Sequence, residues 1–171
     1  IGLGPNGPQT VVLESRSVEP VDRTFPDTDD TVLVTGGARG VTAEIAVAMA
    51  EAGQPRLILM GRSAEPKKEP DWLIGLNSEA EIKCAILAHA GPSITPQEVQ
   101  AEFNSIRSGR EIHRTIKRIS QAGSEVVYRS ADVRDSDAVR ESIAPLVEEY
   151  GPVTGLVHGA GVLADRNIED K

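Results

Sequence analysis

Residues 31–53 constrain the fold of this chain more than any other stretch: "TVLVTGGARGVTAEIAVAMAEAG". They open on an apolar run of strand length, over 31–35, which glycines follow at once. After Gly40 the apolar side chains recur at helical spacing, and Gly53 is the expected C-terminal cap. A strand that turns through glycines directly into a helix is typical of sheets that are covered by helices. The expected apolar face of this helix comprises Val41, Ile45, Ala48, Met49 and Ala52.

Strand and helix signals continue to alternate along the rest of the chain. We expect strands over 56–60, 124–133 and 153–162, and a helix interrupted by Pro145 over 136–151. This order predicts an α/β fold, with a Rossmann-like parallel sheet and flanking helices on both faces.

The chain divides into two parts of different composition. Residues 1–30 are rich in Gly, Pro and Asp and hold one short strand candidate, over 10–14. We expect this part to be a leader, or the tail of a preceding structural subdomain, because it has little apolar surface to bury. Residues 31–171 form the α/β unit.

The connection between the second and third expected strands is far longer than such connections usually are. Ser78 and Thr95 are each followed three residues later by a glutamate, which is the pattern of a helix capping box. We therefore expect a helical insertion over 64–95 and a long crossover helix over 96–121.

Composition excludes several classes of function. The formal net charge of −8 leaves no basic excess to neutralise phosphates, so we expect no nucleic-acid partner. Cys84 is the single cysteine, so no internal disulfide can form. It also has no partner at the spacing of a metal site. No stretch approaches the roughly 18 apolar residues that cross a membrane, and the N-terminus has no secretory signal pattern. We therefore expect a cytoplasmic protein without a membrane contact.

The glycine turn has the chemistry of a phosphate site. A backbone that approaches a pyrophosphate needs residues without a Cβ, and Gly36, Gly37 and Gly40 stand at the junction of strand and helix. The free amides and the positive dipole end of the helix would face the phosphates. A plain tight turn between strand and helix explains the same three glycines, so this motif leaves both interpretations open.

The end of the second expected strand indicates which dinucleotide would bind. It carries Gly61, Arg62 and Ser63, where a dinucleotide-binding fold places the residue that meets the adenosine ribose. An acidic residue there accepts hydrogen bonds from a 2′-hydroxyl, whereas arginine pairs with a 2′-phosphate. Arg62 thus favours NADP(H), with Arg39 as a second cation and Ser63 as a hydroxyl donor. The alternative for Arg62 is a solvated loop arginine.

Two further strand ends complete the candidate site. Asp132 could bond the adenine amino group while Val133 packs on the ring, although an aspartate that caps the next helix is the competing interpretation. The fourth expected strand ends in "HGAG", residues 158–161, where small residues allow close backbone approach. We interpret His158 as a packed or hydrogen-bonded residue at a strand end rather than as a proton donor.

These elements together resemble the short-chain dehydrogenase/reductase family. "TGGARG" matches its Thr-Gly-x-x-x-Gly turn, but Thr42 stands where the family has a third glycine, so we expect looser packing at the start of the helix. "HGAG", "LMGRS" and "SADVRD" are similar to ketoreductase domains of polyunsaturated fatty-acid synthases and polyketide synthases, as is the helical insertion. The cofactor-binding candidates are Thr35, Gly36, Gly37, Ala38, Arg39, Gly40, Val41, Gly61, Arg62, Ser63, Asp132, Val133, His158, Gly159, Ala160 and Gly161.

The resemblance implies hydride transfer from NADPH to the β-keto group of an acyl chain, held by phosphopantetheine on an acyl carrier protein, with other synthase domains as partners. The family's catalytic tyrosine and lysine come well after the His-x-Ala-Gly turn, and Tyr128 and Tyr150 come before it. We therefore expect an incomplete fold, no catalytic residue within this chain, and no activity from these 171 residues alone. A non-catalytic nucleotide-binding or structural module of a synthase, and part of a standalone reductase, remain as alternatives.

Overall fold

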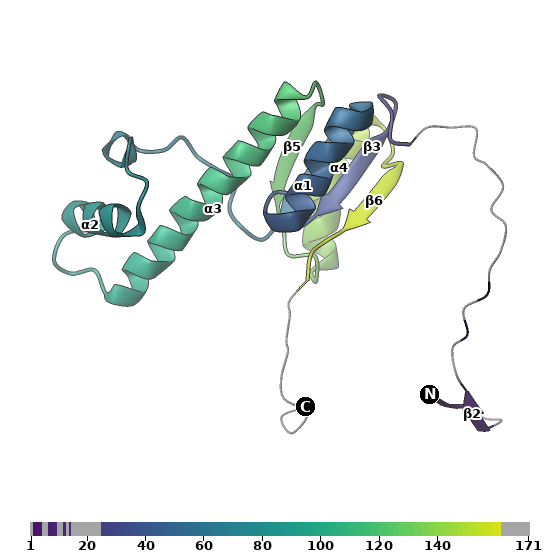
Figure 1. Cartoon of the computed structure of the whole chain (residues 1–171), viewed down its shortest axis with the longest axis horizontal. Coiled ribbons are helices and arrows are strands. Elements are labelled where there is room, and N and C mark those ends of the chain that lie inside the picture. The colour runs from purple at the N-terminus through teal and green to yellow at the C-terminus, as the bar shows by residue number, and fades with distance from the viewer. Residues whose placement is uncertain (1, 5–6, 10–11, 13, 15–24, 162–171) are drawn as a thin grey trace.

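The computed structural model describes residues 2–4, 7–9, 12, 14 and 25–161. Its centre is a four-stranded parallel sheet in the order β5-β4-β3-β6, which confirms the predicted Rossmann-like α/β fold (Figure 1). Thr35 pairs with Met60 on one side and with His158 on the other, so the carboxyl ends of the three strands lie at one edge. The strands are β3 (Thr31–Thr35), β4 (Arg56–Gly61), β5 (Val126–Ser130) and β6 (Gly155–His158).

Helices cover both faces of this sheet. α1 (Gly40–Gly53) and α3 (Pro96–Gln121) pack on one face, and α4 (Ser136–Tyr150) packs on the other (Figure 1). Successive strand residues point to opposite faces, so Val32 and Val34 meet α1 and α3 while Leu33 faces α4. Both faces of β3 and β4 are therefore buried, which explains their continuous apolar sequences.

The buried face of α1 differs from the one that the sequence indicated. Val41 is 80% exposed and Ile45 is 44% exposed, so the predicted face is wrong. The side chains that pack against the sheet are Ala43, Ala46, Val47 and Ala50. Three of these are alanines, whose small side chains let the helix lie close to the strands, and the apolar residues on both sides of α1 hide this preference in the sequence.

The C-terminus of α1 also differs from its prediction. The left-handed residue that ends the helix is Gln54, with φ +51°, rather than Gly53. Gly53 has a different role, because a Cβ at this position would lie 1.7 Å from the carbonyl oxygen of Pro26. The glycine at 53 therefore makes room for the segment that leads into β3.

The predicted insertion is helical and has a small core of its own. It contains a 3₁₀ turn, η1 (Asp71–Leu73), and α2 (Glu79–Ala90), whose buried side chains pack on the N-terminal half of α3. Both predicted capping boxes are present, at Ser78 and Thr95. α3 runs through Gly109 without a break.

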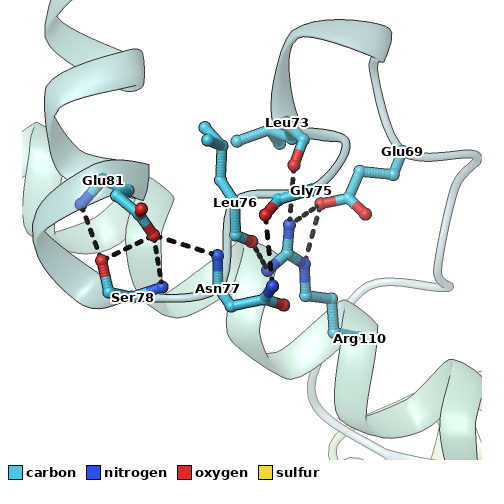
Figure 2. A network of polar contacts seen from close by, with 8 residues as sticks. All are labelled: Glu69, Leu73, Gly75, Leu76, Asn77, Ser78, Glu81 and Arg110. Carbon is cyan, nitrogen blue, oxygen red and sulfur yellow. Dashed lines mark hydrogen bonds and ion pairs between the residues drawn. The ribbon is translucent and has the colours of Figure 1, made fainter.

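Arg110 of α3 fastens the insertion (Figure 2). Its guanidinium donates to the Glu69 carboxylate at 2.8 Å and to the Leu76 and Leu73 carbonyls at 2.7 and 3.2 Å. Three acceptors from the segment between β4 and α2 thus converge on one side chain, and the same view shows the Ser78–Glu81 capping box beside them. The loop between β4 and α2 is therefore held against the middle of the long helix.

Other elements match their predictions less closely. β5 and β6 are shorter than expected. α4 continues through Pro145 instead of being interrupted there. Pro145 is exposed, so water can reach the carbonyl that loses its helical N–H donor. Val12 and Glu14 are not in a strand, and the rest of the 10–14 candidate lies outside the described residues. A short hairpin forms instead from β1 (Gly2–Gly4) and β2 (Gly7–Gln9). Within the described ranges, no helix is long and apolar enough to cross a membrane.

Candidate functional site

A hollow of about 930 Å³ opens at the carboxyl edge of the sheet, where β3, β4, β5 and β6 end. In parallel α/β sheets this is the edge at which ligands bind. The turns after all four strands contribute to it, as the sequence predicts. The predicted cofactor residues that line it are Gly36, Ala38, Arg39, Gly40, Gly61, Arg62, Ser63, Asp132, Val133, His158, Gly159, Ala160 and Gly161.

Three predicted cofactor residues do not line the hollow. The Val41 side chain points to solvent. Gly37 lies against the sheet, because a Cβ there would be 2.4 Å from Cγ1 of Val34. Thr35 is buried, and its hydroxyl lies 2.7 Å from Nδ1 of His158. Thr35 therefore holds the end of β6 in place, and His158 is hydrogen-bonded at a strand end as expected.

The turn after β3 and the turn after β6 are in direct backbone contact. Gly36 has φ +72°, and a Cβ on it would lie 2.8 Å from the carbonyl carbon of Gly159. Gly159 in turn lies under Thr42, since a Cβ on Gly159 would be 2.3 Å from the Thr42 hydroxyl. The expected loose packing at the start of α1 is thus not found. The Thr42 side chain fills the space that a side chain at 159 would need.

Arg39 and the first turn of α1 share a carboxylate. Glu111 of α3 accepts from Nε of Arg39 and from the backbone N–H of Gly40, each at 3.0 Å. Nη1 of Arg39 lies 3.4 Å from the Ser63 hydroxyl. Burial alone would raise the pKa of Glu111, but the Gly40 N–H and the Arg39 guanidinium outweigh it, and the pKa is lowered.

The end of β5 carries a second ion pair. The carboxylate of Asp132 accepts from the side chain and the backbone N–H of Arg134, which lowers the pKa of Asp132 to about 2, helped by the charge of Arg62. Asp132 does not cap α4; Asp135 does, through the N–H groups of Asp137 and Ala138. Among the described residues Arg62 makes no ion pair, so its exposed guanidinium is available to an anion.

Tyr128 supports the loop that carries Arg62. Its hydroxyl donates to the Ser63 carbonyl at 2.8 Å and lies under Gly61, where a Cβ would be 3.1 Å away. Burial raises the pKa of Tyr128. This hydroxyl therefore acts as a fixed donor beneath the loop.

Sequence reasoning misses several residues of the hollow. Met60 and Ala131 are the buried neighbours of predicted loop residues. Glu111 and Arg134 escape prediction because a glutamate within a long polar helix and an arginine after a strand look like ordinary surface charges. The signal that could have found Glu111 is its spacing of four and eight residues from the buried Thr115 and Ile119, which places it on the side of α3 that packs against α1 and the sheet.

No metal centre is found in the part of the chain that the structure describes, since no three His, Cys, Asp or Glu side chains gather there. Cys84 is exposed on α2.

Comparison with known proteins identifies the family. A family model described as the KR domain matches residues 30–171. The chain belongs to the KR domain family. One component of the polyunsaturated fatty acid synthase from Thraustochytrium sp. is 33% identical to this KR chain over 185 residues, which cover all of this chain and 6% of that protein. The resemblance to synthase ketoreductase domains is thus confirmed, and the chain spans only a small part of this relative's length.

Solved structures show the same fold. A ketoreductase domain from the bacillaene assembly line is 27% identical, with a TM-score of 0.53 over 90% of this chain and 27% of that one. Carveol dehydrogenase from Mycobacterium avium, crystallised in complex with NAD, has a TM-score of 0.51 at 21% identity, over 83% of this chain and 39% of that one.

We predict that Gly159→Ala destabilises the protein and that Thr42→Gly relieves part of the loss. The added methyl group overlaps the Thr42 side chain, and overpacking of this kind costs about 1–3 kcal/mol of unfolding free energy. Urea unfolding of the two single variants and the double variant forms a cycle that isolates the coupling. If Gly159→Ala is as stable as the wild type, or if the two effects simply add, the two turns do not pack as described.

We predict that Arg134→Ala raises the pKa of Asp132 from about 2 toward its ordinary value of 3.8. The carboxylate is the form that Arg134 stabilises, so this contact is present at neutral pH and is lost as the pH falls through about 2. Titration of the Asp132 carboxyl carbon by NMR measures both values. An unchanged pKa in the variant contradicts the assignment of Arg134 as the main cause.

Proposed function

We propose that this KR chain is the NADPH-binding part of a β-ketoacyl reductase, which reduces β-keto thioesters carried on an acyl carrier protein. The observation that carries the cofactor assignment is the group formed by Arg39, Arg62 and Ser63 at the carboxyl end of β4. Two guanidinium groups and a hydroxyl there form a donor set for a 2′-phosphate, and no acidic residue occupies the place that would favour a 2′-hydroxyl.

The rest of the hollow fits the other parts of a dinucleotide. The pyrophosphate would lie on the turn from Gly36 to Gly40 at the N-terminus of α1. The adenine would lie beside Asp132 and Val133, and the nicotinamide would extend toward the turn of residues 158–161. The volume of about 930 Å³ is at the upper end of ligand pockets. The NAD bound to carveol dehydrogenase, which shares this fold, supports a dinucleotide in such a domain.

The carboxylates in the hollow are compatible with this cofactor. Glu111 and Asp132 are each paired with an arginine, so neither presents an uncompensated charge to the phosphates. The Asp132 oxygens also keep lone pairs that can accept from an adenine amino group. The residues present therefore fit NADP(H).

The substrate and partners are inferred from relatives. The similarity to an assembly-line ketoreductase and to a polyunsaturated fatty acid synthase supports a β-ketoacyl substrate, an acyl carrier protein and neighbouring synthase domains. NADPH, when bound, supplies the hydride. This chain's own residues would hold the adenosine and pyrophosphate ends, and residues 1–30 would join the domain to a preceding structural part.

Proton donation is assigned to residues outside the 171 of this sequence. Around the hollow, Tyr128 is engaged beneath the β4 loop and His158 is bonded to Thr35, so neither is poised over a substrate carbonyl. We propose that a tyrosine with a nearby lysine, located elsewhere in the intact protein, acts as the acid. If the intact protein lacks such a pair, the module is a non-catalytic nucleotide-binding part of a synthase.

We predict that the intact protein binds NADPH at least about tenfold more tightly than NADH and that Arg62→Ala removes most of this preference. The lost contact is a charged one to the 2′-phosphate, so the affinity for NADH should stay within about twofold. Fluorescence titration with both nucleotides measures the ratio. Arg140→Ala is the control, because Arg140 is also an exposed arginine, lies outside the hollow and is paired with Asp137 on α4. Equal affinities in the wild type would refute the NADP assignment.

We predict that the 171-residue chain alone does not oxidise NADPH in the presence of acetoacetyl thioesters. The physical reason is the absence of a positioned proton donor around the described hollow. The measurement is loss of NADPH absorbance, with the intact protein as the positive control. Turnover by the short chain would place the acid among residues 1–171 and overturn this assignment.

A further inference from the structure

Arg39 is held by a carboxylate on one side of its guanidinium. Its Nε donates to Oε2 of Glu111, whose other oxygen accepts from the Gly40 backbone N–H. Both bonds are 3.0 Å long, so one carboxylate joins α3 to the cation and to the first turn of α1. An arginine on a glycine turn otherwise has many rotamers, and Glu111 restricts them.

The other side of the guanidinium faces the end of β4. Nη1 of Arg39 lies 3.4 Å from the Ser63 hydroxyl, in the loop that also carries Arg62. Since Nε is occupied by Glu111, the terminal nitrogens are left to donate toward this loop. These are the atoms with which an arginine binds a phosphate through two parallel hydrogen bonds.

Glu111 remains a carboxylate while it holds Arg39 and the Gly40 N–H. Although burial works in the opposite direction, the hydrogen bonds from Gly40 and Arg39, together with the charges of Arg39 and Arg107, lower the pKa of Glu111. At neutral pH the pair is therefore ionised on both sides.

We propose that Glu111 is a positioning residue that sets the cofactor preference, by holding Arg39 so that its terminal nitrogens meet the 2′-phosphate of NADPH. This inference rests on the proposed function. In this role Glu111 acts through Arg39, and it also stabilises the turn at Gly40. The specificity of the site is thus determined in part by the crossover helix rather than by the glycine turn and the β4 loop alone.

The test compares Glu111→Ala and Glu111→Gln with a matched control in the intact protein. Arg118→Ala is the control, because Arg118 and Glu44 form another α3–α1 ion pair, at 2.6 Å, that does not line the hollow. Dissociation constants are measured for NADPH and NADH, and for adenosine 2′,5′-bisphosphate and AMP as probes of the adenosine end. Glu111→Ala should weaken NADPH and the bisphosphate about tenfold and leave NADH and AMP within about twofold.

The conservative variant separates positioning from a general effect on folding. Glu111→Gln keeps one acceptor oxygen and nearly the same shape, so we expect a smaller loss in the same direction, and no change in Arg118→Ala. An equal loss for NADPH and NADH would show that Glu111 only supports the turn, and tighter NADPH binding would show that it competes with the phosphate. Either result overturns the inference. A wild type without any NADPH preference instead refutes the proposed function itself, and with it the inference.

Discussion

The site depends on the close approach of two backbone turns at the carboxyl edge of the sheet. Gly36 lies so near the backbone of Gly159 that a side chain at 36 has no room, and Thr42 occupies the space that a side chain at 159 would need. Parallel pairing of β3 with β6 brings these turns together, in the register that sets Thr35 opposite His158. This contact positions the two turns that line the hollow and the residues from which α1 begins.

Much of the fold could be predicted from sequence because its signals are local. The continuous apolar runs of β3 and β4 reflect burial on both faces, and the capping boxes at Ser78 and Thr95 depend only on residues three positions apart. Most of the predicted cofactor residues line the hollow for a related reason. They stand at strand ends, and parallel strands bring their carboxyl ends to one edge regardless of how the helices pack.

What could not be predicted depends on contacts between distant segments. The buried face of α1 is chosen by how closely alanines let it approach the sheet, and the need for Gly53 comes from a carbonyl of the preceding segment. Glu111 belongs to the site only because α3 passes the first turn of α1 at this residue. The pairing of Asp132 with Arg134 is local, yet either residue alone looks like a solvated charge.

The contact between positions 42 and 159 has a consequence for recombining this chain with relatives. The two residues are far apart in sequence but lie against each other, so the side chain at one limits what the other can carry. A graft that brings a residue larger than glycine to 159 and keeps Thr42 creates a steric overlap. The turn after β6 and the first turn of α1 should therefore be transferred together between members of the family.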